Sequence, residues 1–233
     1  MIKNGYTVTE LKKNMFVLDE EGTRAWLFVG EDSALMVDTG FGRNDIKSVT
    51  DELTDKPITV IQTHADGDHV GMTRAYGKVI MHRDELSRFE SEVGTEGLDI
   101  SFVEDGDIVS CGDYNFTILH VPGHTMGSIV LFEKEKGFLI AGDSIQKSDV
   151  FLVGEGRSLP KFIESLKRLE AMEGIEEIYP SHKEYPQPKS LITDLLTCAD
   201  KFLKGELEGT AMPHLPVKGK IYWDGPVGLF IGD

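Results

Sequence analysis

The 233-residue sequence contains only two cysteines, Cys111 and Cys198, so it has neither a disulfide framework nor a C-x-x-C metal-binding pair. Two reduced, buried thiols are typical of a protein kept in a reducing compartment. Long apolar runs are also absent: no segment approaches the ~20 apolar residues that cross a bilayer, and residues 1–21 hold no apolar stretch of signal-peptide length. These absences predict a cytoplasmic protein with no membrane partner.

Basic residues are scarce as well. The 24 lysines and arginines face 40 acidic residues, which gives a formal net charge of −16. Such a surface repels phosphate backbones and anionic lipid, so the charge disfavours binding to nucleic acid or to a membrane surface. We therefore expect a small-molecule substrate. The charge permits either a monomer or an oligomer.

The composition is that of a globular protein, with 40% hydrophobic and 27% charged residues. The chain has no internal repeat, no low-complexity segment and no Pro/Gly/Ser-rich linker. It is long enough to bury a substantial core without disulfides. We therefore expect one domain spanning residues 1–233.

Hydrophobic patterning divides the chain into two similar halves, each with strands followed by βα units. The first half predicts strands at Tyr6–Leu11, Met15–Asp19, Arg24–Val29, Ala34–Asp38, Ile58–Gln62 and Lys78–Met81, with helices at Asn44–Leu53, Gly71–Tyr76 and Asp84–Glu92. The second predicts strands at Asp107–Ser110, Asn115–His120, Ser128–Glu133, Gly137–Ala141 and Ile175–Tyr179, helices at Pro160–Met172 and Lys189–Lys204, and a hairpin of Val217–Trp223 with Val227–Ile231. This order fits two packed sheets with helices on their outer faces.

Four metal-capable side chains, His64, Asp66, Asp68 and His69, fall within six residues directly after the predicted strand Ile58–Gln62. In extended backbone alternate residues point the same way, so His64 and Asp66 can converge on one ion. Asp68 and His69 are expected just before a helix, directed toward a second ion. Imidazole and carboxylate suit zinc, iron or manganese.

Three more candidate ligands follow later strands. His124 lies in a loop between two predicted strands, while Asp143 and His182 come directly after strands. Each alone is more often a turn residue or a surface histidine. Because loops held by a rigid scaffold are where sites usually lie, their recurrence after separate strands predicts one site at an edge of the sheets.

The sequence resembles the metallo-β-lactamase superfamily, in which a His-x-His-x-Asp-His motif after a strand is followed by a lone His, a bridging Asp and a final His. Residues 64–69, His124, Asp143 and His182 match in order, and Asp38 matches an Asp that ends an early strand. The resemblance extends over nearly the full chain. It implies an α/β fold of the four-layer αββα type, with two mixed sheets covered by helices and metals bound at one edge.

One position departs from the family pattern, since Asp66 stands where the motif has its second His. By resemblance, one ion takes His64, Asp66 and His124, the other takes Asp68, His69 and His182, and Asp143 bridges the two. A carboxylate adds a negative charge and a harder oxygen donor, which favours iron or manganese over zinc. Flavodiiron proteins likewise carry a carboxylate here. The expected cofactors are two divalent ions, with their identity left open.

Two ions about 3.5–4 Å apart can activate a bridging water as hydroxide and polarise a carbonyl or phosphoryl oxygen. Asp68 is the candidate catalytic residue, orienting the nucleophile and carrying its proton. The leading hypothesis is a metal-dependent hydrolase that cleaves an ester, thioester, lactone or related small-molecule bond. Two alternatives are a diiron redox protein that requires a separate electron-transfer partner, and a non-catalytic metal- or ligand-binding module.

Several nearby residues have less defined roles. His120 and His82 are predicted to pack or to support ligands, and Tyr185 either packs under neighbouring prolines or reaches a substrate. His214 has no assigned partner. Substrate specificity is expected from loops such as Val150–Leu159 and Met212–Val217, because this scaffold hosts many chemistries.

Overall fold

The computed structural model describes residues 2–213 and 217–232. His214 and part of the loop Met212–Val217 lie outside the described residues. The chain forms two compact units, Met1–Leu119 and His120–Asp233, and each is described by itself. Both combine mixed sheets with helices, which confirms the predicted α/β class.

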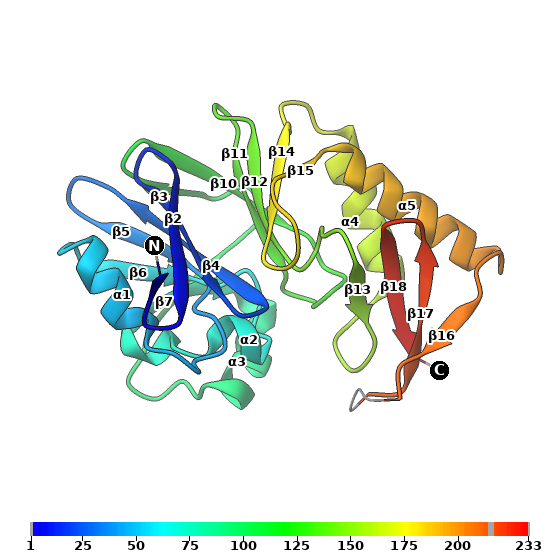
Figure 1. Ribbon diagram of the computed structural model, residues 1–233, viewed down its shortest axis with the longest axis horizontal. Helices are drawn as coiled ribbons and strands as arrows, with labels where there is room; N and C mark the ends of the chain where they lie inside the picture. The colour runs from blue at the N-terminus through cyan, green and yellow to red at the C-terminus, as the bar shows by residue number, and fades with distance from the viewer. Residues whose placement is uncertain (1, 214–216, 233) are drawn as a thin grey trace. The chain divides into compact units, whose positions relative to one another are not determined.

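The first unit is built on an eight-stranded sheet whose strands neighbour one another in chain order (Figure 1). Strands β1 to β5 are antiparallel, and β5 to β8 are parallel. Their bounds are β1 Ile2–Lys3, β2 Tyr6–Lys12, β3 Met15–Glu20, β4 Thr23–Val29, β5 Ala34–Val37, β6 Ile58–Ile61, β7 Lys78–His82 and β8 Asp99–Val103. A further hairpin joins β9 Ile108–Cys111 to β10 Tyr114–His120.

Burial along these strands explains their sequences. Every residue of β5 is buried, as expected for a parallel strand inside a sheet. Strand β2 alternates at its start, with Tyr6 and Val8 buried and Thr7 exposed, so it has one solvated face. Strand β8 was missed by the sequence prediction. Its Asp99 and Ser101 are exposed and alternate with partly buried apolar residues. These polar residues interrupt the apolar run by which the five-residue strand could have been predicted.

Short helices connect the parallel strands: α1 Ile46–Leu53, α2 Gly67–Val70 and α3 Leu86–Glu92, with 3₁₀ turns at Thr73–Ala75 and Arg83–Glu85. The predicted helix start at Gly71 was wrong, because α2 begins at Gly67. Asp66 is its N-cap residue, and its carbonyl accepts the His69 N–H at 2.9 Å. Asp68 and His69 therefore lie within a helical turn rather than before one.

The second unit contains a mixed sheet of β11 Ile129–Glu133, β12 Phe138–Gly142, β14 Glu177–Pro180 and β15 Gln187–Pro188. Strand β12 is antiparallel to β11 and parallel to β14, with Gly142 opposite Pro180. Residues that follow β12 and β14 therefore leave the sheet at the same edge. This pairing places Asp143 and His182 just beyond that edge.

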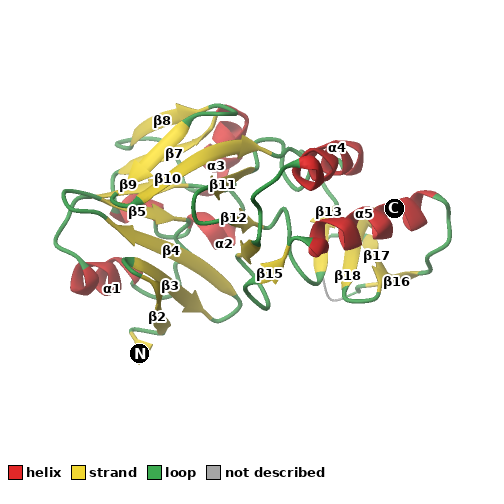
Figure 2. Ribbon diagram, turned by 90° about the horizontal axis from the view of Figure 1, so that it is seen from above, coloured by secondary structure: helices red, strands yellow, loops and turns green. Residues whose placement is uncertain are grey.

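A separate sheet in the second unit has the order β13 Asp149–Leu152, β18 Val227–Gly232, β17 Gly219–Asp224 and β16 Gly209–Ala211. The predicted C-terminal hairpin is confirmed as β17 and β18. The assignment of Val150–Leu159 as a loop was wrong for its first residues, because β13 pairs in parallel with β18. Helices α4 Leu159–Ala171 and α5 Ser190–Leu203 pack together beside this sheet (Figure 2). Among the described residues, no helix is long and apolar enough to span a membrane.

The end of α2 is packed against the loop after β5, and Gly71 makes this possible. The Gly71 N–H donates to Gly40 O at 2.9 Å, and a Cβ at Gly71 would overlap the Phe41 carbonyl carbon and the Gly42 nitrogen. The backbone of Gly71 is right-handed helical, with φ −56°. Glycine is therefore required at position 71 because a Cβ would clash, and not because of the backbone conformation.

We predict that Gly71→Ala lowers the free energy of unfolding by about 2–3 kcal/mol, because backbone atoms cannot move aside as a side chain can. Urea denaturation measures the loss. Gly67→Ala is the matched control, since its added Cβ meets only the end of the Glu92 side chain, at 3.1 Å. Equal losses in the two variants would contradict the close approach at Gly71.

Candidate metal centre

In the first unit, the candidate ligands begin where two parallel strands end. Val37 of β5 lies opposite Ile61 of β6, and the Asp38 N–H donates to Ile61 O at 3.0 Å. Asp38 and Thr63 therefore follow neighbouring strands out of one sheet edge. Open α/β sheets bind ligands at the carboxyl ends of their strands.

A buried hydrogen-bond relay centred on Asp38 orients two of the candidate ligands. The Asp38 carboxylate accepts from the Thr63 N–H at 2.8 Å and from the Thr63 hydroxyl at 2.7 Å. Because that hydroxyl proton is donated to Asp38, the Thr63 oxygen accepts from Nδ1 of His64, 3.0 Å away. Nδ1 of His69 donates to the same Asp38 oxygen at 2.9 Å. Both histidines thus carry their proton on Nδ1, which leaves Nε2 as the metal-binding nitrogen.

Each of these Nε2 atoms faces a carboxylate from the same motif. Nε2 of His64 lies 3.7 Å from Asp66, and Nε2 of His69 lies 3.5 Å from Asp68. The two imidazole rings are neighbours, with centroids 4.0 Å apart. The unit therefore presents two nitrogen–carboxylate pairs side by side.

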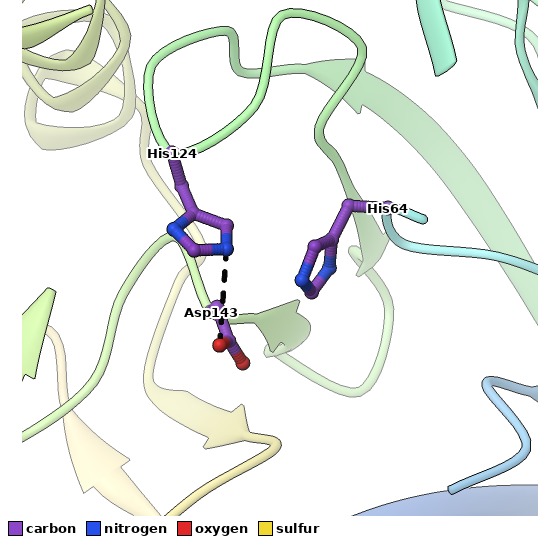
Figure 3. A group of neighbouring side chains, drawn as sticks. All are labelled: His64, His124 and Asp143. Atoms are coloured by element: carbon purple, nitrogen blue, oxygen red, sulfur yellow. Dashed lines mark ion pairs between the residues drawn. The ribbon is translucent and has the colours of Figure 1, made fainter. Parts of the chain in front are cut away.

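The second unit contributes a nitrogen–carboxylate group of its own. Nδ1 of His124 donates to Phe151 O at 2.8 Å, so this ring also offers Nε2. One Asp143 oxygen lies 3.8 Å from Nε2 of His124 and 3.2 Å from Nε2 of His182. Figure 3 draws the first of these pairs, with a dashed line between the imidazole edge and the carboxylate. Asp143 and His182 follow the parallel strands β12 and β14.

Arg157, in the loop between β13 and α4, supports His124 on its other side. Its Nη1 lies 2.9 Å from Nδ1 and 3.1 Å from Nε2 of the ring, so the guanidinium lies against the ring rather than in line with either nitrogen. The same nitrogen donates to His124 O at 3.2 Å and to Phe151 O at 3.4 Å. Arg157 therefore ties the His124 loop to the end of β13.

Both groups have the chemistry and spacing that a divalent ion requires. Imidazole nitrogens and carboxylate oxygens are borderline to hard donors, suited to zinc, iron and manganese. Two donors that each lie about 2.1 Å from a tetrahedral ion are roughly 3.4 Å apart. The nitrogen–oxygen separations above span 3.2 to 3.8 Å. The residues of each unit therefore fit a metal ion.

Asp66 has an additional partner that the sequence did not indicate. Its Oδ1 accepts from Nη1 of Arg88, in α3, at 3.1 Å, while its Oδ2 is the oxygen that faces His64. The two oxygens thus serve different partners. No local motif identifies Arg88, because it lies 22 residues from Asp66 in sequence.

Two further histidines among the described residues, His120 and His82, make contacts of other kinds. Nε2 of His120 lies 2.8 Å from Met126 O, inside the loop that carries His124, so His120 supports that loop as predicted. Nδ1 of His82 accepts from the Asp84 N–H at 3.2 Å, and its Nε2 lies 3.5 Å from Glu104. The Tyr185 ring lies near the Tyr179 ring, with ring centroids 6.2 Å apart.

Neither cysteine is suited to be a nucleophile. Both are buried. Burial raises the pKa of the Cys111 thiol, and burial together with the nearby Asp224 carboxylate raises the pKa of Cys198 to about 11. Both thiols are therefore protonated near neutral pH, and covalent catalysis through a thiolate is disfavoured.

The sequence matches the metallo-beta-lactamase superfamily over residues 18–182, a span that contains all seven candidate ligands. The chain belongs to this superfamily. The resemblance inferred from the residue motifs is thereby confirmed.

Curated relatives carry two related names. The chain is 26% identical over 167 residues to an acyl-coenzyme A thioesterase, MBLAC2, of Bos taurus, covering 54% of this chain and 60% of that protein. It is 32% identical over 133 residues to a hydroxyacylglutathione hydrolase of Gloeothece citriformis, covering 54% of this chain and 50% of that protein. The chain thus spans between half and two thirds of the length of these relatives.

Solved structures establish the fold. A beta-lactamase domain protein from Burkholderia ambifaria superposes with a TM-score of 0.70 at 18% identity, covering 88% of this chain and 79% of that one. A metallo-beta-lactamase from Pontibacter korlensis gives 0.69 at 18% identity, covering 84% and 99%. The predicted metallo-β-lactamase-like fold is confirmed.

We predict that Thr63→Val weakens metal binding at least tenfold, because it removes the hydroxyl that fixes the His64 tautomer, and such supporting contacts typically contribute 10- to 100-fold. Competition with a chromophoric chelator measures the affinity. Thr63→Ser keeps the hydroxyl and should bind metal within about threefold of the wild type, since the supporting contact of the ligand is retained. Equal binding by the Val and Ser variants would show that the Thr63 hydroxyl does not support metal binding.

Proposed function

We propose that the chain is a metal-dependent hydrolase that cleaves a thioester of a small-molecule acyl donor at a dinuclear site. One observation carries the proposal: in each of four histidines, His64, His69, His124 and His182, Nε2 faces a carboxylate oxygen at 3.2–3.8 Å. In the first three, Nδ1 makes a hydrogen bond that leaves Nε2 available. Superfamily membership and the absence of a thiolate nucleophile support it.

The proposed ligands divide into two sets. His64, Asp66 and His124 hold one ion, while Asp68, His69 and His182 hold the other. Asp143 would be shared by the two sets, a role supported by its single oxygen near both His124 and His182.

When bound, the two ions lower the pKa of a water molecule and polarise the scissile carbonyl. The protein's contribution is to fix the donors before substrate arrives. Buried relays hold the histidines in one tautomer, so little reorganisation accompanies the reaction. Asp68 is more accessible than its neighbours, with its side chain 24% exposed against 0% for His69, so it can accept a proton from water and pass it to the leaving thiolate.

A thioester is the preferred substrate class for two reasons. The relatives are named for thioester hydrolysis, on acyl-coenzyme A or on hydroxyacylglutathione. Thioesters also have a good leaving group, so their hydrolysis requires water activation more than protonation of the departing atom. The part of the chain after α5 that the structure describes forms β16 to β18, and these strands are candidates to shape specificity.

We predict that protein purified without added metal contains about two equivalents of zinc, iron or manganese, following the two-ion site. His124→Ala and His182→Ala should each lose about one, measured by elemental analysis. The metal-loaded protein should hydrolyse acyl-coenzyme A or S-lactoylglutathione, followed by thiol release. Metal binding without hydrolysis of thioesters, esters or lactones would favour a binding module, and reversible redox of bound iron would favour diiron chemistry.

We predict that Asp68→Asn lowers kcat at least 100-fold while KM changes little, because general-base assistance contributes 10²–10⁴-fold. Steady-state kinetics with the best thioester measures both constants. Elemental analysis of the same preparation shows whether the second ion is retained. A variant that keeps two ions and full kcat would exclude Asp68 as the proton carrier.

A further inference from the structure

Asp66 is the position where the chain departs from the superfamily motif. Its side chain does not cap the helix that it precedes. Asp66 is the N-cap residue of α2, with φ −72° and ψ 148°, yet its carboxylate makes no capping hydrogen bond. Asp is common at N-caps because it usually makes that bond. The carboxylate is directed instead toward His64 on one side and Arg88 on the other.

The pair between Asp66 and Arg88 is largely shielded from water. The side chains are 16% and 29% exposed, and Nη1 lies 3.1 Å from Oδ1. The attraction within a shielded pair is screened less by solvent and salt than that within an exposed pair. Acidic groups lie close by: the buried Glu85 accepts from the Ala65 N–H at 2.8 Å, and Asp68 follows two residues later. Arg88 thus places a cation within a cluster of acids.

We infer that Arg88 is a positioning residue that makes Asp66 act in place of the motif's histidine; this rests on the dinuclear site proposed above. By holding Oδ1, Arg88 leaves Oδ2 as the single oxygen directed to the side of His64. By its charge, it offsets the negative charge that a carboxylate adds relative to an imidazole. Asp66 and Arg88 together then supply one donor atom and no net charge, as a neutral imidazole does.

Two physical consequences follow. A carboxylate tied at one oxygen binds an ion through the other oxygen only, whereas a released carboxylate can bind through both. Binding through two oxygens and full negative charge favour hard ions such as Mn²⁺ over Zn²⁺. Arg88 therefore keeps the ion preference closer to zinc than Asp66 alone would.

The test compares Zn²⁺ and Mn²⁺ affinities of the full chain, stripped of metal and titrated against a chromophoric chelator. Arg88→Gln should raise the Mn²⁺-to-Zn²⁺ affinity ratio about tenfold, in the range typical for partners of metal ligands. Arg88→Lys keeps the charge but loses the planar fork, so it should shift the ratio less. Thermal unfolding of the metal-free variants reports folding separately.

A compensating pair sharpens the test. Asp66→His alone places an imidazole beside an unneutralised guanidinium and should weaken Zn²⁺ binding at least tenfold. Adding Arg88→Gln to it should restore Zn²⁺ affinity to within about threefold, because supporting residues are matched to the ligand that they hold.

The outcomes distinguish the role of Arg88 from the existence of the dinuclear site. A wild-type protein that binds two ions, with an affinity ratio unchanged in Arg88→Gln, would overturn the role of Arg88 and leave the dinuclear site standing. The same holds if the variants change only the thermal unfolding of the metal-free protein, as a structural ion pair would. A wild-type protein that binds no metal would overturn both proposals.

Discussion

The buried carboxylate of Asp38 is the constraint on which the first unit's candidate ligands depend. A carboxylate with no solvent access must be surrounded by donors, because an unpaired buried charge is very costly. The donors come from Thr63 and from the His69 ring, so burying Asp38 brings the end of β5, the end of β6 and helix α2 together. Asp38 itself has φ 60°, a left-handed conformation that Asp tolerates better than most residues. The strained turn places the carboxylate at the point where both histidines can be fixed by one group.

The second unit fixes its histidine differently. Nδ1 of His124 donates to a backbone oxygen, Phe151 O, and the ring is held on its face by Arg157. A carbonyl acceptor depends on the position of β13 rather than on a side chain, so it is preserved by any substitution that keeps β13 paired with β18. The small C-terminal sheet therefore has a role in the candidate centre, because it positions the carbonyl that sets the tautomer of His124. Substitutions that unpair β13 are expected to reach the metal-binding residues through this contact.

The side chains proposed as ligands could be selected from sequence because they follow the ends of predicted strands, which hydrophobic patterning indicates. The strand assignments β2 to β7 and β10 to β12 agree with prediction to within two residues at either end. What escaped prediction depends on partners far apart in the chain. Strand β13 exists because residues 149–152 pair with 228–231, and Arg88 is related to Asp66 only through the packing of α3 near α2. The start of α2 was also misplaced, because the helix was predicted from Gly71, whereas Gly67–Val70 already form a helical turn with the extended residue Asp66 as N-cap.

In the proposed centre, Asp66 would influence the choice of metal through two separable properties. Its oxygen is a harder donor than an imidazole nitrogen, and that property is unaffected by neighbours. The effect of its negative charge, by contrast, is reduced by a nearby positive charge. The Arg88 guanidinium, 3.1 Å away, provides that positive charge. The sequence alone shows a carboxylate for an imidazole and so suggests both a harder and a more negative site. Under the role inferred for Arg88, donor hardness is the part of that difference that would remain, because Arg88 holds Oδ1 and Oδ2 lies toward His64. If the inferred role of Arg88 holds, the His-to-Asp change would alter the proposed centre less than the motif implies when Arg88 is not considered.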